Sequence, residues 1–144
     1  MTKLVAQRRL AILWFACAGV LAGLFVLLTL FNRFGSQGAV AWQWYSQNVI
    51  PTLTLITGSF YATTQTKARR TAPVDVFSYR LCFGVSAFYL LVLLLTVLAA
   101  PLAWQQAGLS LLSLLNASQA YLILLQGVAT YALGIFFVKS CPDA

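Results

Sequence analysis

Few side chains in this sequence could transfer protons, attack a carbonyl group or bind a metal ion. Histidine is absent, the acidic residues are Asp75 and Asp143 alone, and the three cysteines have spacings that match no metal-binding motif. General acid–base, covalent and metal-assisted catalysis depend on such groups. The sequence therefore predicts a protein that is not an enzyme and has no catalytic residue, metal site or cofactor. We expect Cys17, Cys82 and Cys141 to be free thiols.

Asp75 follows Ala72-Pro73-Val74 and immediately precedes an apolar run. A carboxylate in that place can accept hydrogen bonds from the first N–H groups of a helix, which have no partner within the helix. It can also pair with the nearby Arg80. Both roles are structural, and we expect one of them rather than a functional carboxylate.

Uncharged polar side chains recur at helical spacing in two apolar segments. At about 100° per residue, one face of the last segment carries Asn116, Gln119, Gln126 and Thr130. A similar face of the second segment carries Asn48, Thr52, Ser59 and Thr63. Because amides are costly against lipid tails, they turn toward protein or water. The two interpretations are hydrogen bonds between helices and a hydrophilic path through the membrane.

The hydroxyl groups of the second segment have a simpler use as well, since they can bond carbonyl groups of their own helix. Thr54 and Thr57 lie off the polar face, so this helix is polar on more than one side and should be surrounded by protein. The third segment lacks polar groups over most of its length. It is the one that we expect to face lipid.

Small residues form a smooth face in the first apolar segment. Gly19 and Gly23 are four residues apart, and Ala16 extends the face toward the N-terminus. Such steps let two helix backbones approach closely in a membrane. The bulkier Ile12 limits the face to about two helical turns. We expect helix packing here, with a partner either in the same chain or in another copy.

The elements that position these residues are predicted to be membrane-spanning helices. Of 144 residues, 61% are hydrophobic and 8% are charged, against roughly a quarter charged in soluble domains. Uncharged apolar runs at residues 10–31, 81–100 and 114–138 each have about the 20 residues that cross a bilayer. The more polar run 46–65 is the weakest of the four predicted spans, with a re-entrant or interfacial segment as the alternative. Pro51 fits this span in its first turn, where its missing N–H has no intrahelical partner.

The basic residues give these four spans an orientation. Arg33 falls on one side, and the other eight of the nine basic residues fall on the opposite side: Lys3, Arg8, Arg9, Lys67, Arg69, Arg70, Arg80 and Lys139. Lys and Arg near span ends favour the cytoplasmic side. Both termini and a basic loop of Lys67, Arg69, Arg70 and Arg80 are therefore predicted to be cytoplasmic. The net charge of +7 reflects these flanks, so we do not expect nucleic acid as a partner.

The predicted fold is a single all-α domain over residues 1–144, an integral membrane protein with a bundle of four transmembrane helices. A bacterial inner membrane is the expected location. Three functions fit this fold. The first is a membrane anchor or scaffold subunit that assembles with itself or with a partner membrane or cytoplasmic protein. The second is an oligomeric pore or channel lined by the polar residues of spans two and four.

The third function is a small transporter, and it is the least supported of the three. No carboxylate lies within a predicted span to couple transport to ions.

The pore needs several copies, because four helices are too few to enclose a wide path. The sequence therefore favours the scaffold, whose expected partners are membrane lipids and further protein chains.

Overall fold

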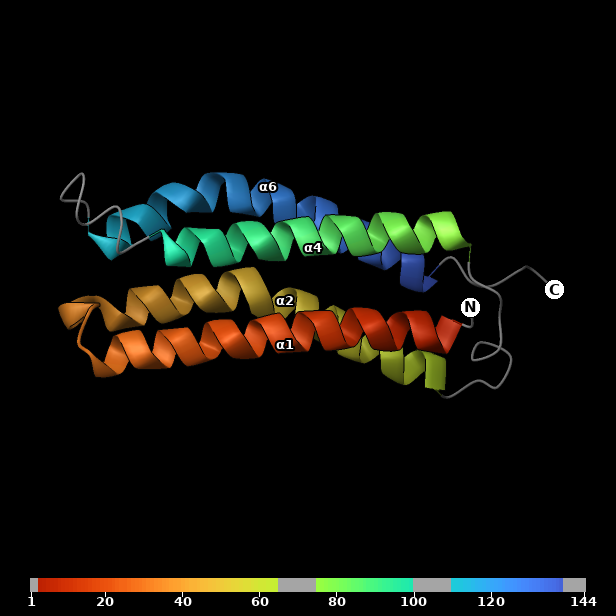
Figure 1. Ribbon diagram of the computed structural model, residues 1–144, viewed down its shortest axis with the longest axis horizontal. Coiled ribbons are helices and arrows are strands. Elements are labelled where there is room, and N and C mark those ends of the chain that lie inside the picture. The colour runs from red at the N-terminus through yellow and green to blue at the C-terminus, as the bar shows by residue number, and fades with distance from the viewer. Residues whose placement is uncertain (1–2, 65–74, 100–109, 139–144) are drawn as a thin grey trace.

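The computed structural model describes residues 3–64, 75–99 and 110–138, and these residues are almost entirely helical. The helices are α1 (Lys3–Leu30), α2 (Gly38–Thr64), α4 (Val76–Leu98) and α6 (Leu111–Val138). A short 3₁₀ helix, η1 (Gly35–Gln37), joins the first two. Figure 1 shows that the four long helices lie lengthwise beside one another, each antiparallel to the next along the chain.

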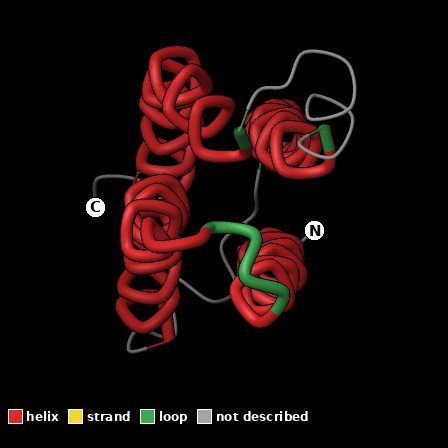
Figure 2. Tube along the Cα trace, turned by 90° about the vertical axis from the view of Figure 1, so that its left-hand side faces the viewer, coloured by secondary structure: helices red, strands yellow, loops and turns green. Residues whose placement is uncertain are grey.

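The helices form a bundle in which each packs against two others. α1 contacts α2 and α4, and α6 contacts the same two helices. The bundle is seen end-on in Figure 2, with the α1–α2 turn toward the viewer. The predicted all-helical bundle is therefore confirmed.

Three of the helices are long enough and apolar enough to cross a membrane: Leu4–Leu30 within α1, Val76–Leu98 in α4 and Leu112–Phe137 within α6. α2 has 27 residues and no charge, but it is too polar to meet the same hydropathy requirement. The helices also extend beyond the predicted spans, since α1 begins at Lys3 and α2 at Gly38. A helix ends where its backbone is capped, whereas hydropathy marks only the part suited to hydrocarbon.

The turn between α1 and α2 is encoded by residues that tolerate a left-handed backbone. Asn32 has φ 53° and Gly35 has φ 54°. The N–H of Arg33 donates to the carbonyl of Leu28 over 2.9 Å, and that of Asn32 to Thr29 over 3.0 Å. This paired closure is a Schellman motif, in which Asn is the usual substitute for Gly. It ends α1 and lets the chain reverse.

Asp75 caps the start of α4. Its carboxylate accepts hydrogen bonds from the N–H groups of Phe77 and Ser78, at 3.2 and 3.3 Å, and from the Ser78 hydroxyl at 2.8 Å. Of the two predicted roles for this residue, the structure therefore shows the cap. Two of the N–H groups that a helix start leaves without an intrahelical partner are satisfied in this way.

Acidification should weaken this cap. The hydrogen bond from the Ser78 hydroxyl, followed by those from the Phe77 and Ser78 N–H groups, lowers the pKa of Asp75 in the folded chain. A lowered folded pKa stabilises the fold above the unfolded pKa, and that stabilisation is lost as pH falls through the folded value. We expect the unfolding temperature in detergent to be constant above about pH 5 and to decline below about pH 4. The Asp75→Asn variant keeps a capping oxygen that does not titrate, so an undiminished decline in it would contradict this assignment.

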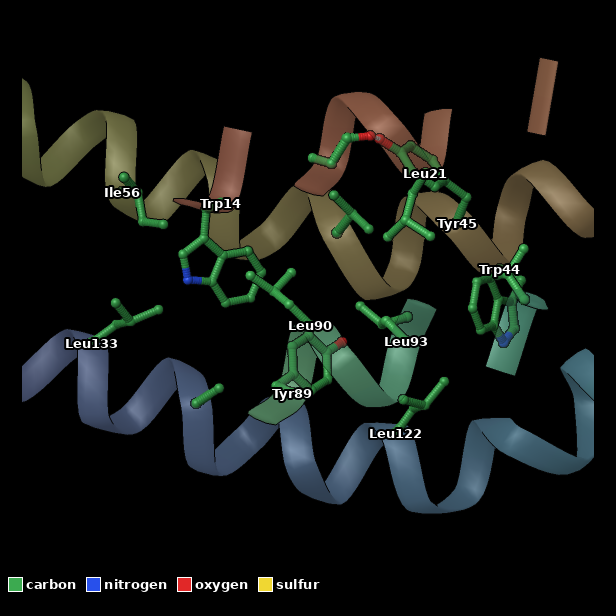
Figure 3. Close-up of a cluster of buried hydrophobic side chains, with 14 of the residues drawn as sticks. Trp14, Leu21, Trp44, Tyr45, Ile56, Tyr89, Leu90, Leu93, Leu122 and Leu133 are labelled. Atoms are coloured by element: carbon green, nitrogen blue, oxygen red, sulfur yellow. Dashed lines mark hydrogen bonds between the residues drawn. The ribbon is translucent and has the colours of Figure 1, made fainter. Parts of the chain in front are cut away.

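Aromatic and aliphatic side chains together fill the centre of the bundle (Figure 3). The rings of Trp14 and Tyr89 stack with centroids 5.7 Å apart, which joins α1 to α4. Phe25 stacks on Trp44 at 5.8 Å, which joins α1 to α2. The Tyr45 hydroxyl donates to the carbonyl of Ala18 over 3.0 Å. Ring packing, with one hydrogen bond from Tyr45, thus connects the first helix to its neighbours.

Within this chain, α4 is the most enclosed of the three apolar helices and not the most exposed. In its apolar stretch 39% of the residues are buried, against 28% in the apolar stretches of α1 and of α6. Its unburied face is nevertheless apolar, with Leu81, Leu91 and Leu95 each more than half exposed. The expectation that this helix faces lipid stays a prediction.

Candidate functional site

Amide side chains meet where α2 packs against α6. Gln119 of α6 donates from Nε2 to Oε1 of Gln47, 3.1 Å away, and its own Oε1 accepts a 3.3 Å hydrogen bond from Nδ2 of Asn48. The same Nδ2 donates to the carbonyl of Trp44 at 2.8 Å, so both of its hydrogens are used. Gln126 donates from Nε2 to the backbone carbonyl of Gln47 at 3.0 Å. We call Gln47, Asn48, Gln119 and Gln126 the amide network.

Pro51 explains why a side chain bonds to a backbone carbonyl in the middle of a helix. It lies in the interior of α2, whereas the sequence placed it in the first turn. In an α-helix, the N–H of residue 51 would bond the carbonyl of residue 47, and proline has no N–H. The Gln126 amide donates to that carbonyl instead. Proline is tolerated in membrane helices when a neighbouring helix satisfies the freed group in this way.

The polar face predicted for the last segment is only partly in the network. Gln119 and Gln126 are half-buried and form hydrogen bonds to α2. Asn116 is exposed and Thr130 is half-buried, and neither belongs to the network. Of the two interpretations of this face, hydrogen bonding between helices describes the two glutamines.

The hydroxyl groups of α2 follow two patterns. Those of Thr54, Thr57 and Ser59 bond carbonyl groups of their own helix, at 2.5 to 2.8 Å. Thr52 is fully buried, and its hydroxyl has no hydrogen-bond partner among the described residues. The side chain of Thr63 lies outside the described part of the chain. Since Thr54 and Thr57 are exposed, the expectation that protein surrounds α2 does not hold within one chain.

Three contributors to this region were not singled out in the sequence. Gln47 takes part through both its side chain and its backbone. Ser118 accepts a 3.3 Å hydrogen bond from Nε1 of Trp44, and the Tyr89 hydroxyl donates to the carbonyl of Asn48 at 2.9 Å. Gln47 was predictable, because a proline in a helix leaves the carbonyl four residues earlier without its N–H partner, and Gln47 stands four residues before Pro51. The other two depend on which helices are neighbours, and no local pattern states that.

The small-residue face of α1 points away from the other helices. Ala16, Gly19 and Gly23 are all exposed. A Cβ atom added at Gly19 or Gly23 would meet no atom within 4 Å. A close contact with the described part of the same chain is thereby excluded, and the contact with another copy stays a prediction.

The described basic residues lie toward the ends of the bundle. Arg8 and Arg9 are near the start of α1 and Arg80 is near the start of α4, and Figure 1 shows these two helix starts at the same end. Arg33 lies in the turn between α1 and α2, at the opposite end. Lys67, Arg69, Arg70 and Lys139 lie outside the described residues.

The length and composition of three helices, together with hydrogen bonds between amides of neighbouring helices, define a helical bundle of the kind that membrane proteins form. Comparisons of the chain with protein-family models, with curated proteins and with solved structures find no match.

Proposed function

We propose that this protein is a non-enzymatic membrane subunit, an anchor or scaffold that assembles with itself or with a partner membrane or cytoplasmic protein. The observation that carries the proposal is that the amide side chains of α6 form hydrogen bonds to α2. Gln119 and Gln126 are engaged in hydrogen bonds to α2, so they hold two helices together. An uncovered small-residue face on α1 remains for a further chain.

The proposed placement in the membrane has α2 as a fourth span and both termini on the cytoplasmic side of an inner membrane. Three lines support it. α2 carries no charge along its 27 residues. The carbonyl of Gln47 that its proline leaves free is bonded by Gln126 of α6, as a span within a bilayer requires. The starts of α1 and α4 carry Arg8, Arg9 and Arg80, while Arg33 is alone at the other end, which favours the first end as cytoplasmic.

Assembly through α1 is tested by filling its smooth face. We expect the Gly19→Leu/Gly23→Leu double variant to change from a mainly assembled to a mainly monomeric particle. The larger side chains hold the two backbones apart, and the monomer tolerates them because no atom lies within 4 Å of either position. The measurement is the mass of the detergent-solubilised particle by light scattering. Gly58→Leu is the matched control, since a Cβ there also meets nothing within 4 Å; an assembled double variant would contradict assembly through this face.

An oligomeric pore is the second candidate, and one observation favours it. Gln47 and Asn116 are exposed on the helices that carry the network. A ring of several copies with that surface inward would present amides to a lumen, where they can replace part of a solute's hydration. Reproducible currents from the purified protein in planar bilayers would establish the pore and overturn the scaffold.

A further inference from the structure

A groove of about 380 Å³ lies on the surface between α4 and α6. Its lining includes Arg80, Gly84 and Phe88 of α4 and Leu125 and Val128 of α6. The lining is apolar except for the guanidinium group of Arg80 and the hydroxyl of Tyr89, which is engaged with the carbonyl of Asn48. The groove is therefore apolar along most of its length and positively charged at the end that includes Arg80.

Gly84 leaves space open in the middle of the groove. It lies between Leu81 and Phe88, one helical turn to either side, and both of these side chains are more than half exposed. A Cβ at Gly84 would meet no atom within 4 Å, so the space above the glycine is open. From Arg80 to Phe88 the groove follows about 12 Å of helix axis, which reaches from near the helix start toward the middle of a bilayer leaflet.

Arg80 has no acidic partner in the part of the chain that the structure describes. Asp75 is the one acidic residue there, and its carboxylate is engaged by Phe77 and Ser78 at the helix start. Arg80 is exposed and lies in the second turn of α4. In a membrane-spanning helix, that position is at the level of the lipid headgroups, where a long basic side chain extends its charge to the interface.

We propose that this groove binds an anionic phospholipid, with the phosphate on Arg80 and one acyl chain lying over Gly84 toward Phe88 and Leu125. Basic pockets between membrane helices are suited to such headgroups. Charge favours a lipid over a second copy of this chain as the occupant. The chain has nine basic and two acidic residues, so another copy has little negative charge to offer Arg80. The site requires membrane insertion and does not depend on assembly through α1.

The test is native mass spectrometry of the full-length protein titrated with phosphatidylglycerol or with phosphatidylcholine of the same acyl chains. We expect one tightly retained lipid and a preference for phosphatidylglycerol. Arg80→Gln should lower the phosphatidylglycerol affinity about fivefold, the effect of one basic side chain at a membrane surface, and should remove the preference. Gly84→Leu should abolish retention of both lipids, because its side chain occupies the groove.

Matched controls separate the groove from general effects. Arg9→Gln removes an exposed arginine near the start of α1, and Gly58→Leu adds a side chain in open space on α2. Both should bind lipid as the wild type does. The proposal is overturned if the wild type retains no lipid, if Arg80→Gln keeps the full preference, or if Gly84→Leu retains lipid normally. It is also overturned if the wild type is a dimer without bound lipid and Gly84→Leu converts that dimer to a monomer. In that case a second copy of the chain occupies the groove.

Discussion

The Gln126→Leu variant is expected to lose about 2 kcal/mol of unfolding free energy. The substitution keeps the approximate volume of the side chain and removes the donor that satisfies the carbonyl of Gln47, 3.0 Å away. That carbonyl has no intrahelical partner, because residue 51 is proline. Leucine therefore costs the hydrogen bond and leaves an acceptor without its partner, and the second of these losses is the more expensive.

Titration with SDS in mixed micelles, followed by circular dichroism, measures this free energy. Gln43→Leu is the control, since Gln43 is an exposed glutamine of α2, the helix to which Gln126 bonds. The control should change the free energy by less than about 0.5 kcal/mol. Equal losses in the two variants would mean that Gln126 has no special role.

The Trp14→Ala variant should be destabilised by about 3 kcal/mol, the largest effect that we expect from a single substitution in this chain. Trp14 is fully buried and stacks on Tyr89, which is also buried. Removing the indole leaves a cavity between α1 and α4 and deprives Tyr89 of its packing partner. We place the loss at the lower end of the range for Trp→Ala, because the buried indole N–H has no hydrogen-bond partner among the described residues and only packing is lost.

Phe15 provides the control for this second prediction. It is the next residue in α1, is also aromatic, and is 49% exposed. The same SDS titration should show that Phe15→Ala changes the unfolding free energy by less than about 0.5 kcal/mol. A larger loss for Phe15→Ala than for Trp14→Ala would mean that the buried and exposed faces of α1 are assigned the wrong way round.

The helices were predictable because local patterns determine them. Three apolar runs become three apolar helices, and Asp75 before such a run becomes a cap. The beginning of α2 was not predictable in the same way. Hydropathy favoured a start near residue 46, but α2 begins at Gly38, because the aromatic residues Trp42 and Trp44 extend the helix while packing against Phe25.

The candidate site was predictable in its residue types but not in its pairing. Gln119 and Gln126 stand out as amides in an apolar helix, and that signal is local. Gln47 could be recognised as the residue whose carbonyl the proline of α2 leaves free, but its pairing with these two amides can be recognised only when α2 and α6 are known to be neighbours. The small-residue face shows the same limit, because spacing identifies Gly19 and Gly23 as a smooth surface, whereas the arrangement of the bundle decides that this surface is outside.

The central claim is that the amides of α6 serve to hold α2, and a double-mutant cycle between Pro51 and Gln126 tests it most directly. Pro51→Ala restores an N–H that can bond the carbonyl of Gln47 within the helix. If Gln126 compensates for the proline, Gln126→Leu should cost about 2 kcal/mol in the wild type and less than half of that in the Pro51→Ala background. Additive losses, with no coupling between the two positions, would contradict the claim and leave the amides free for another use.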